Sequence, residues 1–329
     1  MTAARAALRL LGTDRGLRWT ILPVLVLLAS LVTLAFPARD GPLALFEALA
    51  PVAYGALLLL LALAAWVRPP GLAVVTAAVV AFGVVAYGPP SDSSPAPDPP
   101  TITVMTWNLH GGGLGEMGFT SVLEQVNPDV IVLEEARLRR VDLPLVERWQ
   151  SRIELPFAAT PPGMVILSRL PIDAHGVVDQ PSAAWDRTRA AWIRIALAGR
   201  TVTIVGVHLT FPLASFPCPY CPEARDGEVR ALATYAAQAI GSGNRLVIMG
   251  DFNLTEREPA YRDLAAVLAD AGASAGATWR PVGVEAAPPV LRLDHIFTSP
   301  GIVAGNSGVL CPGTRSDHCP LVATVGLGR

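Results

Sequence analysis

Three long apolar segments occupy the first 88 residues, and they restrict most strongly what the chain can form. The segments cover residues 19–36, 43–67 and 72–88. Each is close to the ~20 residues that a helix needs to cross a hydrocarbon core of ~30 Å. The alternatives are buried core helices, or a cleaved signal peptide for the first segment, but a signal peptide explains one segment and not three. We predict a three-helix transmembrane anchor over residues 1–88.

The placement of arginine predicts the orientation of these spans. The residues before the first segment include Arg5, Arg9, Arg15 and Arg18 but a single acidic residue, Asp14. Arginine-rich flanks stay on the cytoplasmic side, so we expect the N-terminus inside. Three spans then place the rest of the chain outside the cytoplasmic membrane, whereas two spans would leave it in the cytoplasm. The predicted location is the cell membrane, multi-pass, with an extracytoplasmic globular domain.

A Pro- and Ser-rich linker separates the apolar part from a domain of different composition. Residues 89–100 read PPSDSSPAPDPP, which is typical of an extended tether. Residues 101–329 contain 22 acidic residues and 19 arginines, so the net charge is 19 minus 22, or −3. Because no basic face stands out, nucleic acid is not expected as a partner.

From residue 101 onward, short apolar runs dominate. They predict strands over residues 102–107, 130–133, 164–167, 190–197, 201–208, 246–249, 291–298 and 321–325, with helices over 118–126, 223–240 and 259–269. Many strands with few interspersed helices favour two mixed sheets packed face to face. The predicted fold class is α/β: a four-layer α/β sandwich, with two mixed β-sheets flanked by helices, preceded by the three-helix anchor.

Polar side chains recur at the ends of the predicted strands. They are Asn108, His110, Glu135, His208, Asp251, Asn253, Asp294, Asp317 and His318. Oxygen ligands suit Mg²⁺, which is typically held by one or two carboxylates together with substrate phosphate. Such an ion polarises a phosphoryl group, so the set predicts a hydrolase with Mg²⁺ as cofactor and Mn²⁺ as the alternative. The absence of a Walker A motif argues against a P-loop enzyme.

The segment LVIMGDFN, residues 246–253, carries two of these groups. Asp251 and Asn253 are two residues apart, and on an extended chain their side chains point the same way. Such a pair can orient a water and hold a phosphoryl oxygen. The simpler alternative is an Asx turn, because Asp and Asn are common turn residues.

Seven short segments occur in a fixed order between Thr101 and the C-terminus. They are TWNLH, VIVLEE, GMVILSRLPI, GVHLT, IMGDFNLT, RLDHIF and SDHCPLV. The ordered set resembles the endonuclease/exonuclease/phosphatase superfamily, which includes DNase I, AP endonucleases and sphingomyelinases. The resemblance implies a catalytic domain over residues 101–329 that hydrolyses phosphoric esters or anhydrides with a divalent metal.

The resemblance also implies a set of metal ligands. Glu135 is the expected principal Mg²⁺ ligand, helped by Asn108 and by Asp317. His110 stands where several relatives carry an acidic residue. Glu134 stands where many relatives carry Gln, which implies that it supports the site without binding metal.

The same resemblance implies the catalytic residues. Asp251 and Asn253 are expected to orient the nucleophilic water and the phosphate. His318 is expected to pair with Asp294 and either to contact the phosphoryl group or to serve as the base. His208 matches the histidine that DNase-like members use as an acid or a phosphate ligand.

The anchor, the linker and this domain together resemble the VanJ-type proteins of actinobacteria. That resemblance implies a role in resistance to glycopeptide antibiotics, notably teicoplanin, and dephosphorylation of undecaprenyl pyrophosphate. The expected partners are a lipid phosphate substrate and membrane lipids. A membrane-anchored nuclease or sphingomyelinase-like phosphodiesterase is the alternative, and a degenerate binding protein is a third. The bond cleaved and the oligomeric state stay open.

All four cysteines lie in the globular domain, at positions 218, 221, 311 and 319. An even number in an oxidising compartment favours disulfides. Three pairings are open. We favour Cys218–Cys221 with Cys311–Cys319 over cross-pairs such as Cys218–Cys311, and over a zinc site of four cysteines.

An aromatic and Pro-rich segment, FPLASFPCPYCP at residues 211–222, directly follows the strand that ends at His208. We expect Phe211, Phe216 and Tyr220 to contact a lipid tail or the membrane interface, where aromatic side chains are favoured. An ordinary surface loop closed by a disulfide is the alternative.

Overall fold

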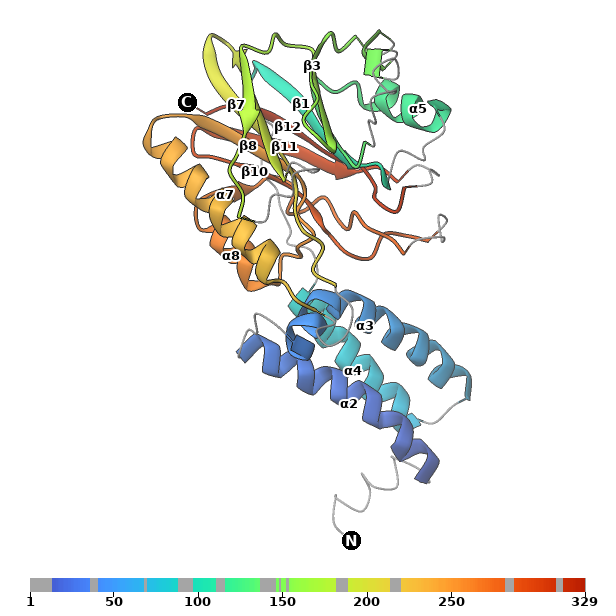
Figure 1. Cartoon of the computed structure of the whole chain (residues 1–329). Helices are drawn as coiled ribbons and strands as arrows, with labels where there is room; N and C mark the ends of the chain where they lie inside the picture. The colour runs from blue at the N-terminus through green and yellow to red at the C-terminus, as the bar shows by residue number, and fades with distance from the viewer. Residues whose placement is uncertain are drawn as a thin grey trace. The chain divides into compact units, whose positions relative to one another are not determined.

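Two compact units follow one another along the chain, Met1–Pro89 and Pro90–Arg329 (Figure 1). The computed structural model describes residues 14–35, 41–67, 70–87, 97–110, 116–136, 146–147, 149–151, 154–181, 189–213, 220–281, 287–311 and 316–328. Most of the predicted linker, residues 89–96, lies outside the described residues. Its extended form and the exact domain limits therefore stay predictions.

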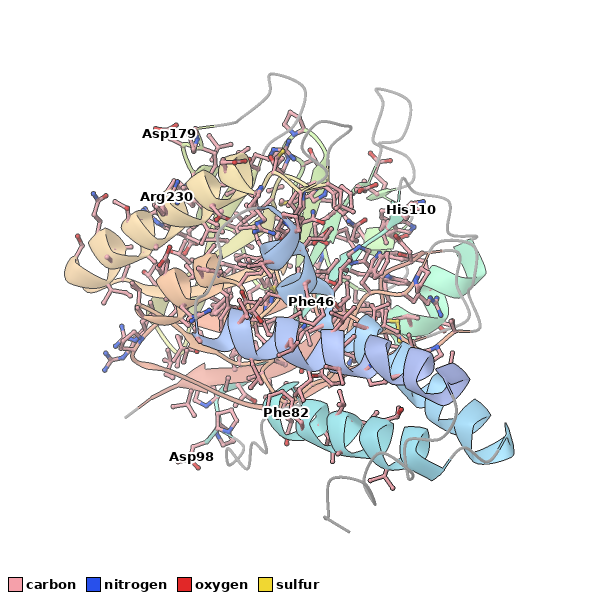
Figure 2. All side chains as sticks on the ribbon, turned by 90° about the horizontal axis from the view of Figure 1, so that it is seen from below. Phe46, Phe82, Asp98, His110, Asp179 and Arg230 are labelled. Atoms are coloured by element: carbon pink, nitrogen blue, oxygen red, sulfur yellow. A yellow bond between two sulfur atoms is a disulfide. The ribbon has the colours of Figure 1, made fainter. Side chains whose placement is uncertain are left out.

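Three helices make up the described part of the first unit, and they coincide with the predicted apolar segments. They are α2 (Asp14–Ala35), α3 (Gly41–Val67) and α4 (Pro70–Tyr87). The buried side chains that join them are Val26, Tyr54, Leu57 and Val79. Phe46 and Phe82, which are labelled in Figure 2, pack against this cluster. One polar contact reinforces the packing, because Ser30 Oγ and Tyr54 Oη are hydrogen-bonded at 2.8 Å.

Length and apolarity together decide whether a helix can cross a bilayer. Over the described portions of α2, α3 and α4, no helix meets both requirements. The transmembrane anchor thus stays a prediction. The orientation of the predicted spans also stays a prediction, because Arg5 and Arg9 lie outside the described residues.

One mixed sheet of the second unit has the strand order β11-β12-β1-β2-β4-β3. Its strands are β1 (Thr101–Asn108), β2 (Val130–Glu134), β3 (Phe157–Ala159), β4 (Met164–Ser168), β11 (Ile302–Val309) and β12 (Leu321–Leu327). β1 runs parallel to β2 and antiparallel to β12. Helix α5 (Glu116–Val126) covers the outer face, where Phe119 and Leu123 share a buried cluster with Trp107 and Leu133.

The other mixed sheet has the order β5-β6-β7-β8-β10-β9. Its strands are β5 (Ala174–Val177), β6 (Ala190–Leu197), β7 (Arg200–His208), β8 (Arg245–Asp251), β9 (Ala269–Asp270) and β10 (Asp294–Thr298). β8 runs parallel to β7 and antiparallel to β10. Helices α7 (Glu223–Gly241) and α8 (Pro259–Ala265) cover the outer face, where Leu232 and Leu264 pack with Val205 and Ile248.

The inner faces of the two sheets form the central core. Val104 and Val132 from the first sheet pack with Ile204, Val247 and Ile296 from the second. Alternate residues of each strand point inward, so both sheets can bury one face here and the other under helices. The predicted arrangement of two mixed sheets flanked by helices is confirmed.

The four strands that lack a predicted counterpart are β3, β5, β9 and β11, which are the four sheet edges. An edge strand is buried less completely, so its sequence need not form a continuous apolar run. In β5, for example, every residue is half-buried or exposed. Two predicted limits are wrong: the helix expected to reach residue 269 ends at Ala265, and the strand expected from residue 291 begins at Asp294.

Asp270 ties the edge strand β9 to neighbouring elements. Its buried carboxylate accepts hydrogen bonds from Arg292 Nη1 at 2.7 Å and Tyr261 Oη at 2.8 Å, and His295 Nδ1 lies 3.3 Å away. Burial raises the pKa of this carboxyl, but the hydrogen bond from His295 and the charge of Arg292 lower it more. The net pKa lies well below the usual range of an aspartate.

Asp270→Asn is expected to lower the free energy of unfolding at neutral pH by about 3 kcal/mol, because buried Arg292 loses its closest countercharge. Since the folded-state pKa is depressed, this stabilisation is complete above the unfolded-state pKa of about 4 and is lost as pH falls further. Urea unfolding at neutral pH and at about pH 3 should show the difference from wild type narrowing in acid. Asp173→Asn, at an exposed position, is the control; a similar loss there would contradict the interpretation.

Candidate active site

The polar strand ends meet where the central strands of the two sheets finish. In the parallel pair β1–β2, Asn108 lies opposite Glu134, and in the parallel pair β7–β8, His208 lies opposite Asp251. Asp251 also faces Asp294 across β8 and β10. The Asn108 amide donates to Asp251 Oδ2 at 2.9 Å, which joins the two sheets directly. The register of the strands therefore gathers these side chains in one place.

Gly250 allows β8 to deliver Asp251 to this position. Its φ is +151°, and a Cβ at Gly250 would lie 1.9 Å from the carbonyl oxygen of Val207 on the neighbouring strand. No side chain fits there, so glycine is required by close approach of the backbones.

Asp251 forms an Asx turn and also faces the site. Its Oδ1 accepts a hydrogen bond from the backbone N–H of Asn253 at 2.8 Å. Its Oδ2 lies 3.9 Å from His208 Nε2 and 3.7 Å from His318 Nε2. The simpler interpretation of the GDFN segment is therefore correct locally, and the second carboxylate oxygen remains directed at the two histidines.

Asn253 has a left-handed backbone, with φ at +48°, which Asn adopts more readily than most residues. Its Nδ2 donates to the Leu209 carbonyl at 3.0 Å and lies 3.4 Å from Asp251 Oδ2. The amide is therefore held beside the Asp251 carboxylate.

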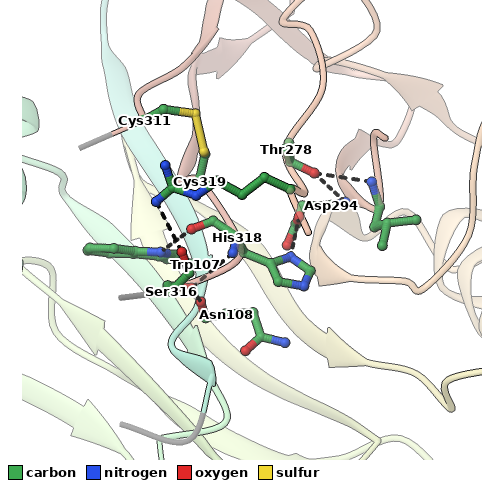
Figure 3. The surroundings of a disulfide bond; sticks show 10 residues. Trp107, Asn108, Thr278, Asp294, Cys311, Ser316, His318 and Cys319 are labelled. Atoms are coloured by element: carbon green, nitrogen blue, oxygen red, sulfur yellow. Dashed lines mark hydrogen bonds and ion pairs between the residues drawn. A yellow bond between two sulfur atoms is a disulfide. The ribbon is translucent and has the colours of Figure 1, made fainter. Parts of the chain in front are cut away.

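His318 and Asp294 form the closest histidine–carboxylate pair of the site, with Nδ1 and Oδ2 2.8 Å apart (Figure 3). Burial lowers the pKa of His318, but the charges of Asp294 and Asp251 outweigh it and raise the pKa to about 10. The indole N–H of Trp107 donates to the backbone carbonyl of His318 at 3.0 Å. The imidazole is thus a fixed cation whose Nε2 points towards Asp251.

A disulfide lies directly beside His318. Cys311 and Cys319 are bonded, as predicted, and Figure 3 shows the bridge next to the His318 backbone. It closes the segment that carries Asp317 and His318. Cys221 is disulfide-bonded as well, but Cys218 lies outside the described residues, so the predicted Cys218–Cys221 pairing stays a prediction.

Glu135 and His208 lie on the other side of Asp251. His208 Nε2 is 3.7 Å from Glu135 Oε1, and Asn108 Nδ2 is 3.4 Å from the same oxygen. Burial lowers the pKa of His208, while Asp251 and Glu135 partly offset it. Glu135 has a φ of +51°, a strained conformation of the kind that recurs at functional sites.

The carboxylate of Asp317 contacts Trp279 and His110. Its Oδ2 accepts a hydrogen bond from the Trp279 indole N–H at 3.0 Å, and its Oδ1 lies 3.1 Å from His110 Nδ1. His110 is linked to the site through its backbone N–H, which donates to Asn108 Oδ1 at 2.9 Å. Trp279 follows no strand and belongs to no motif, so no sequence signal identifies it.

Glu134 is a buried acid behind the site. Its Oε1 accepts a hydrogen bond from Thr106 Oγ1 at 2.6 Å. Burial raises its pKa well above the usual value. The hydrogen bond from Thr106 lowers the pKa by less than burial raises it, and the charges of Asp294 and Asp251 raise it further. A neutral carboxylic acid resembles a Gln side chain in size and hydrogen bonding, which agrees with the predicted supporting role.

Two groupings offer ligands for a divalent cation. The predicted one centres on Glu135 and Asn108, which the structure brings together with Asp251; Asp317 is turned instead to Trp279 and His110. The two carboxylates supply oxygen ligands of the kind that Mg²⁺ and Mn²⁺ prefer, while the Asn108 amide turns its Nδ2 to both of them and its Oδ1 to the His110 N–H. The residues present therefore fit such an ion.

The second grouping is Asp251, Asp294 and His318, whose ligand atoms lie within 4.8 Å of one another. Asp294 Oδ1 is buried and has no hydrogen-bond partner among the described residues. The expected position of the cation, at Glu135 and Asn108, therefore stays a prediction beside this second grouping.

The sequence matches the endonuclease/exonuclease/phosphatase family over residues 105–318. This range runs from within β1 to His318 and includes all the candidate catalytic and metal-ligating side chains described above. The chain belongs to this family. Its members are metal-dependent phosphoesterases and nucleases, so the predicted enzyme class, a metal-dependent phosphoric ester or anhydride hydrolase, is confirmed. The finer resemblance to VanJ-type proteins stays a prediction.

Solved structures of the endonuclease/exonuclease/phosphatase fold are similar to the chain at low identity. A family protein from Bacteroides thetaiotaomicron has a TM-score of 0.55 at 18% identity, covering 71% of this chain and 100% of its own. The mannosyl-6-phosphatase Bt3783 of that species has 0.54 at 18%, with 69% and 100% covered. The human nocturnin catalytic domain with bound sulfate has 0.53 at 19%, with 71% and 96% covered. No protein with a curated description matches the sequence.

Glu135→Gln and His318→Ala are each expected to reduce phosphate-ester hydrolysis by about 10²–10⁴-fold, because the first removes the expected principal cation ligand and the second removes the expected phosphoryl contact or base. Steady-state rates with p-nitrophenyl phosphate measure the effect, and circular dichroism and thermal unfolding check the fold. His175→Ala is the matched control, since this histidine is exposed on the edge strand β5. Full activity in both site variants would refute these assignments.

Proposed function

We propose that this family member is a membrane-anchored, Mg²⁺-dependent phosphohydrolase that cleaves a lipid phosphate or pyrophosphate, such as undecaprenyl pyrophosphate, at the outer face of the cytoplasmic membrane. A contribution to glycopeptide resistance would follow from that activity. The observation that carries the hydrolase part is that His318, paired with Asp294, and His208 both face the buried Asp251 carboxylate, with Glu135 next to His208.

Each side chain has a distinct task in this proposal. Asp294 fixes the orientation of His318, whose cationic Nε2 binds a phosphoryl oxygen as negative charge develops. Asp251 orients the attacking water and takes its proton, with the Asn253 amide beside it. Glu135 and Asn108 hold the cation, which would polarise the phosphoryl group when bound.

His208 completes the site from the other side of Asp251. With its pKa lowered by burial, it is a neutral imidazole that can share a hydrogen bond with a phosphate or leaving-group oxygen. This form suits the role of phosphate ligand, which is one of the two roles that the family resemblance implies, and not the role of acid.

The substrate class is supported by the rest of the chain. Three apolar segments precede the domain, and tethering at a bilayer would favour an amphiphilic substrate. The structural neighbours include a mannosyl-6-phosphatase and a nocturnin catalytic domain with a bound sulfate anion. A zebrafish TDP2 complexed with single-strand DNA product is a neighbour too, but the net charge of −3 beyond residue 100 counts against a polyanionic polymer.

Hydrolysis by the full chain tests this proposal, followed as phosphate release from undecaprenyl pyrophosphate and by chromatography of the products of the phosphodiester substrates. In detergent, undecaprenyl pyrophosphate should be hydrolysed, and sphingomyelin, a phosphoinositide and DNA should be poor substrates. EDTA should abolish the activity and added Mg²⁺ restore it, because the carboxylate site loses its cation. Intact cells that produce the chain should also hydrolyse lipid added from outside.

Glu135→Gln protein prepared in parallel controls for contaminating phosphatases. Preferential cleavage of DNA or sphingomyelin would overturn the lipid pyrophosphate proposal in favour of a phosphodiesterase. Activity confined to lysed cells would overturn the outward orientation.

The segment after His208 presents apolar side chains to solvent. Phe211 is 56% exposed and Leu213 is 46% exposed. Tyr220 is instead 2% exposed and hydrogen-bonded to Glu258, so the expectation that it contacts lipid is wrong. Phe216 lies outside the described residues. Three residues span at most about 11 Å, so Phe211 is within reach of a chain attached to a phosphate at His208.

Phe211→Ser combined with Leu213→Ser is expected to raise KM for a lipid phosphate about ten-fold or more, because apolar surface that would be buried against the lipid is lost. KM for p-nitrophenyl phosphate should stay unchanged. The matched control is Val177→Ser with Val303→Ser, which changes two exposed residues of the edge strands β5 and β11. Equal effects on both substrates, or in both double variants, would count against lipid contact here.

A further inference from the structure

A buried guanidinium lies directly behind Asn253. Arg225, in the first turn of α7, is 1% exposed. Its Nη1 donates to the backbone carbonyl of Asn253 at 2.7 Å, and its Nη2 donates to Glu258 Oε1 at 2.7 Å. Asp226 Oδ1 accepts from the same guanidinium at 2.9 Å. The cation is therefore fully engaged, and one of its bonds ends on a residue of the candidate site.

Glu258 extends this contact over the whole segment that follows β8. Its Oε2 accepts hydrogen bonds from the backbone N–H of Thr255 at 2.7 Å and from Thr255 Oγ1 at 3.2 Å. Residues 253–258 are thus held at their start by Arg225 and further along by Glu258, which Arg225 itself binds. Tyr220 joins the segment that follows β7 to the same hydrogen-bond network, because its hydroxyl contacts both Glu258 and Arg225 Nη1.

The conformation of Asn253 explains why such an anchor is needed. β8 ends at Asp251, so no ladder hydrogen bond of the sheet reaches the Asn253 carbonyl. The residue is 7% exposed, and a buried carbonyl requires a donor. Its φ of +48° is unfavourable for a side-chain-bearing residue and persists only where the surroundings impose it. Arg225 supplies the donor, and it fixes the peptide plane from which the Asn253 side chain projects.

We propose that Arg225 is a positioning residue that holds Asn253 in its working conformation beside Asp251, through the Asn253 carbonyl and through Glu258. The proposal rests on the role given to Asn253 in the proposed function. Arginine suits this task because two of its nitrogens bind two different acceptors at once, whereas a lysine has a single nitrogen. The groups around it also favour the charged form: burial lowers the pKa of Arg225, but the carboxylates of Glu258 and Asp226 and the hydroxyl of Tyr220 raise it more.

Arg225→Lys in the full chain tests the proposal, with p-nitrophenyl phosphate as substrate. We expect kcat to fall about ten-fold or more with KM changed less than about two-fold, because misplacement of an orienting group acts mainly on the transition state. Arg292→Lys is the matched control. It changes another buried arginine, whose ion pairs run to Asp270 and Glu256 and not to Asn253, so kcat should stay near wild type.

A double-variant cycle separates positioning from a general loss of structure. Asn253→Ala alone should lower kcat strongly, and Arg225→Lys added to it should lower kcat by less than about two-fold further. If Arg225→Lys does not fold, Glu258→Gln takes its place in the same cycle with the same expectation. Thermal unfolding of every variant reports the fold.

The positioning role would be overturned if the kcat losses of Arg225→Lys and Asn253→Ala multiply independently in the double variant. It would also be overturned if Arg292→Lys loses as much kcat as Arg225→Lys. Full activity of Asn253→Ala would overturn it as well. In that case, inactive Glu135→Gln and His318→Ala proteins would show that the proposed hydrolytic site itself still stands.

Discussion

The hydrogen bond between the Asn108 amide and the Asp251 carboxylate is the contact on which the site depends. It joins the last residues of two strands that belong to different sheets, so its length is set by how closely the sheets pack. That spacing comes from the aliphatic core between them, where Val104 and Val132 meet Ile204 and Val247. Close-packed interiors transmit small changes in volume, so core packing and site geometry are linked here.

Buried charge is the second constraint. Asp251 is 1% exposed, and an ionised carboxylate in that position needs donors and countercharge. Asn108 and the Asn253 backbone provide donors, and the His318 cation provides charge. The Asp251 carboxylate therefore lies between the imidazoles of His208 and His318. The need to hold His318 in place also explains why Trp107, which approaches no phosphate, donates a hydrogen bond to the His318 carbonyl.

The sequence predicts the central strands well and the edge strands not at all, for a physical reason. β1, β2, β7 and β8 are buried on both faces and therefore read as apolar runs, whereas β3, β5, β9 and β11 have one free side and mixed sequences. The same logic applies to the site. Side chains at the ends of central strands, such as Glu135 and His208, stand out after apolar runs. Trp279 and Arg225 act from other elements and carry no such signal.

The sequence by itself determined which groups are chemically able to act, the order in which they follow the strands, and the family to which the chain belongs. It left three cysteine pairings open, and the structure shows the favoured Cys311–Cys319 bond. The tertiary structure decided which of those groups meet. Asn108 and Asp251 are 143 residues apart, and only the packing of one sheet on the other brings them into contact. It also turned Asp317 towards Trp279 and placed Arg225 behind Asn253, because hydrogen-bond partners of buried groups are chosen by proximity in space and not by sequence spacing.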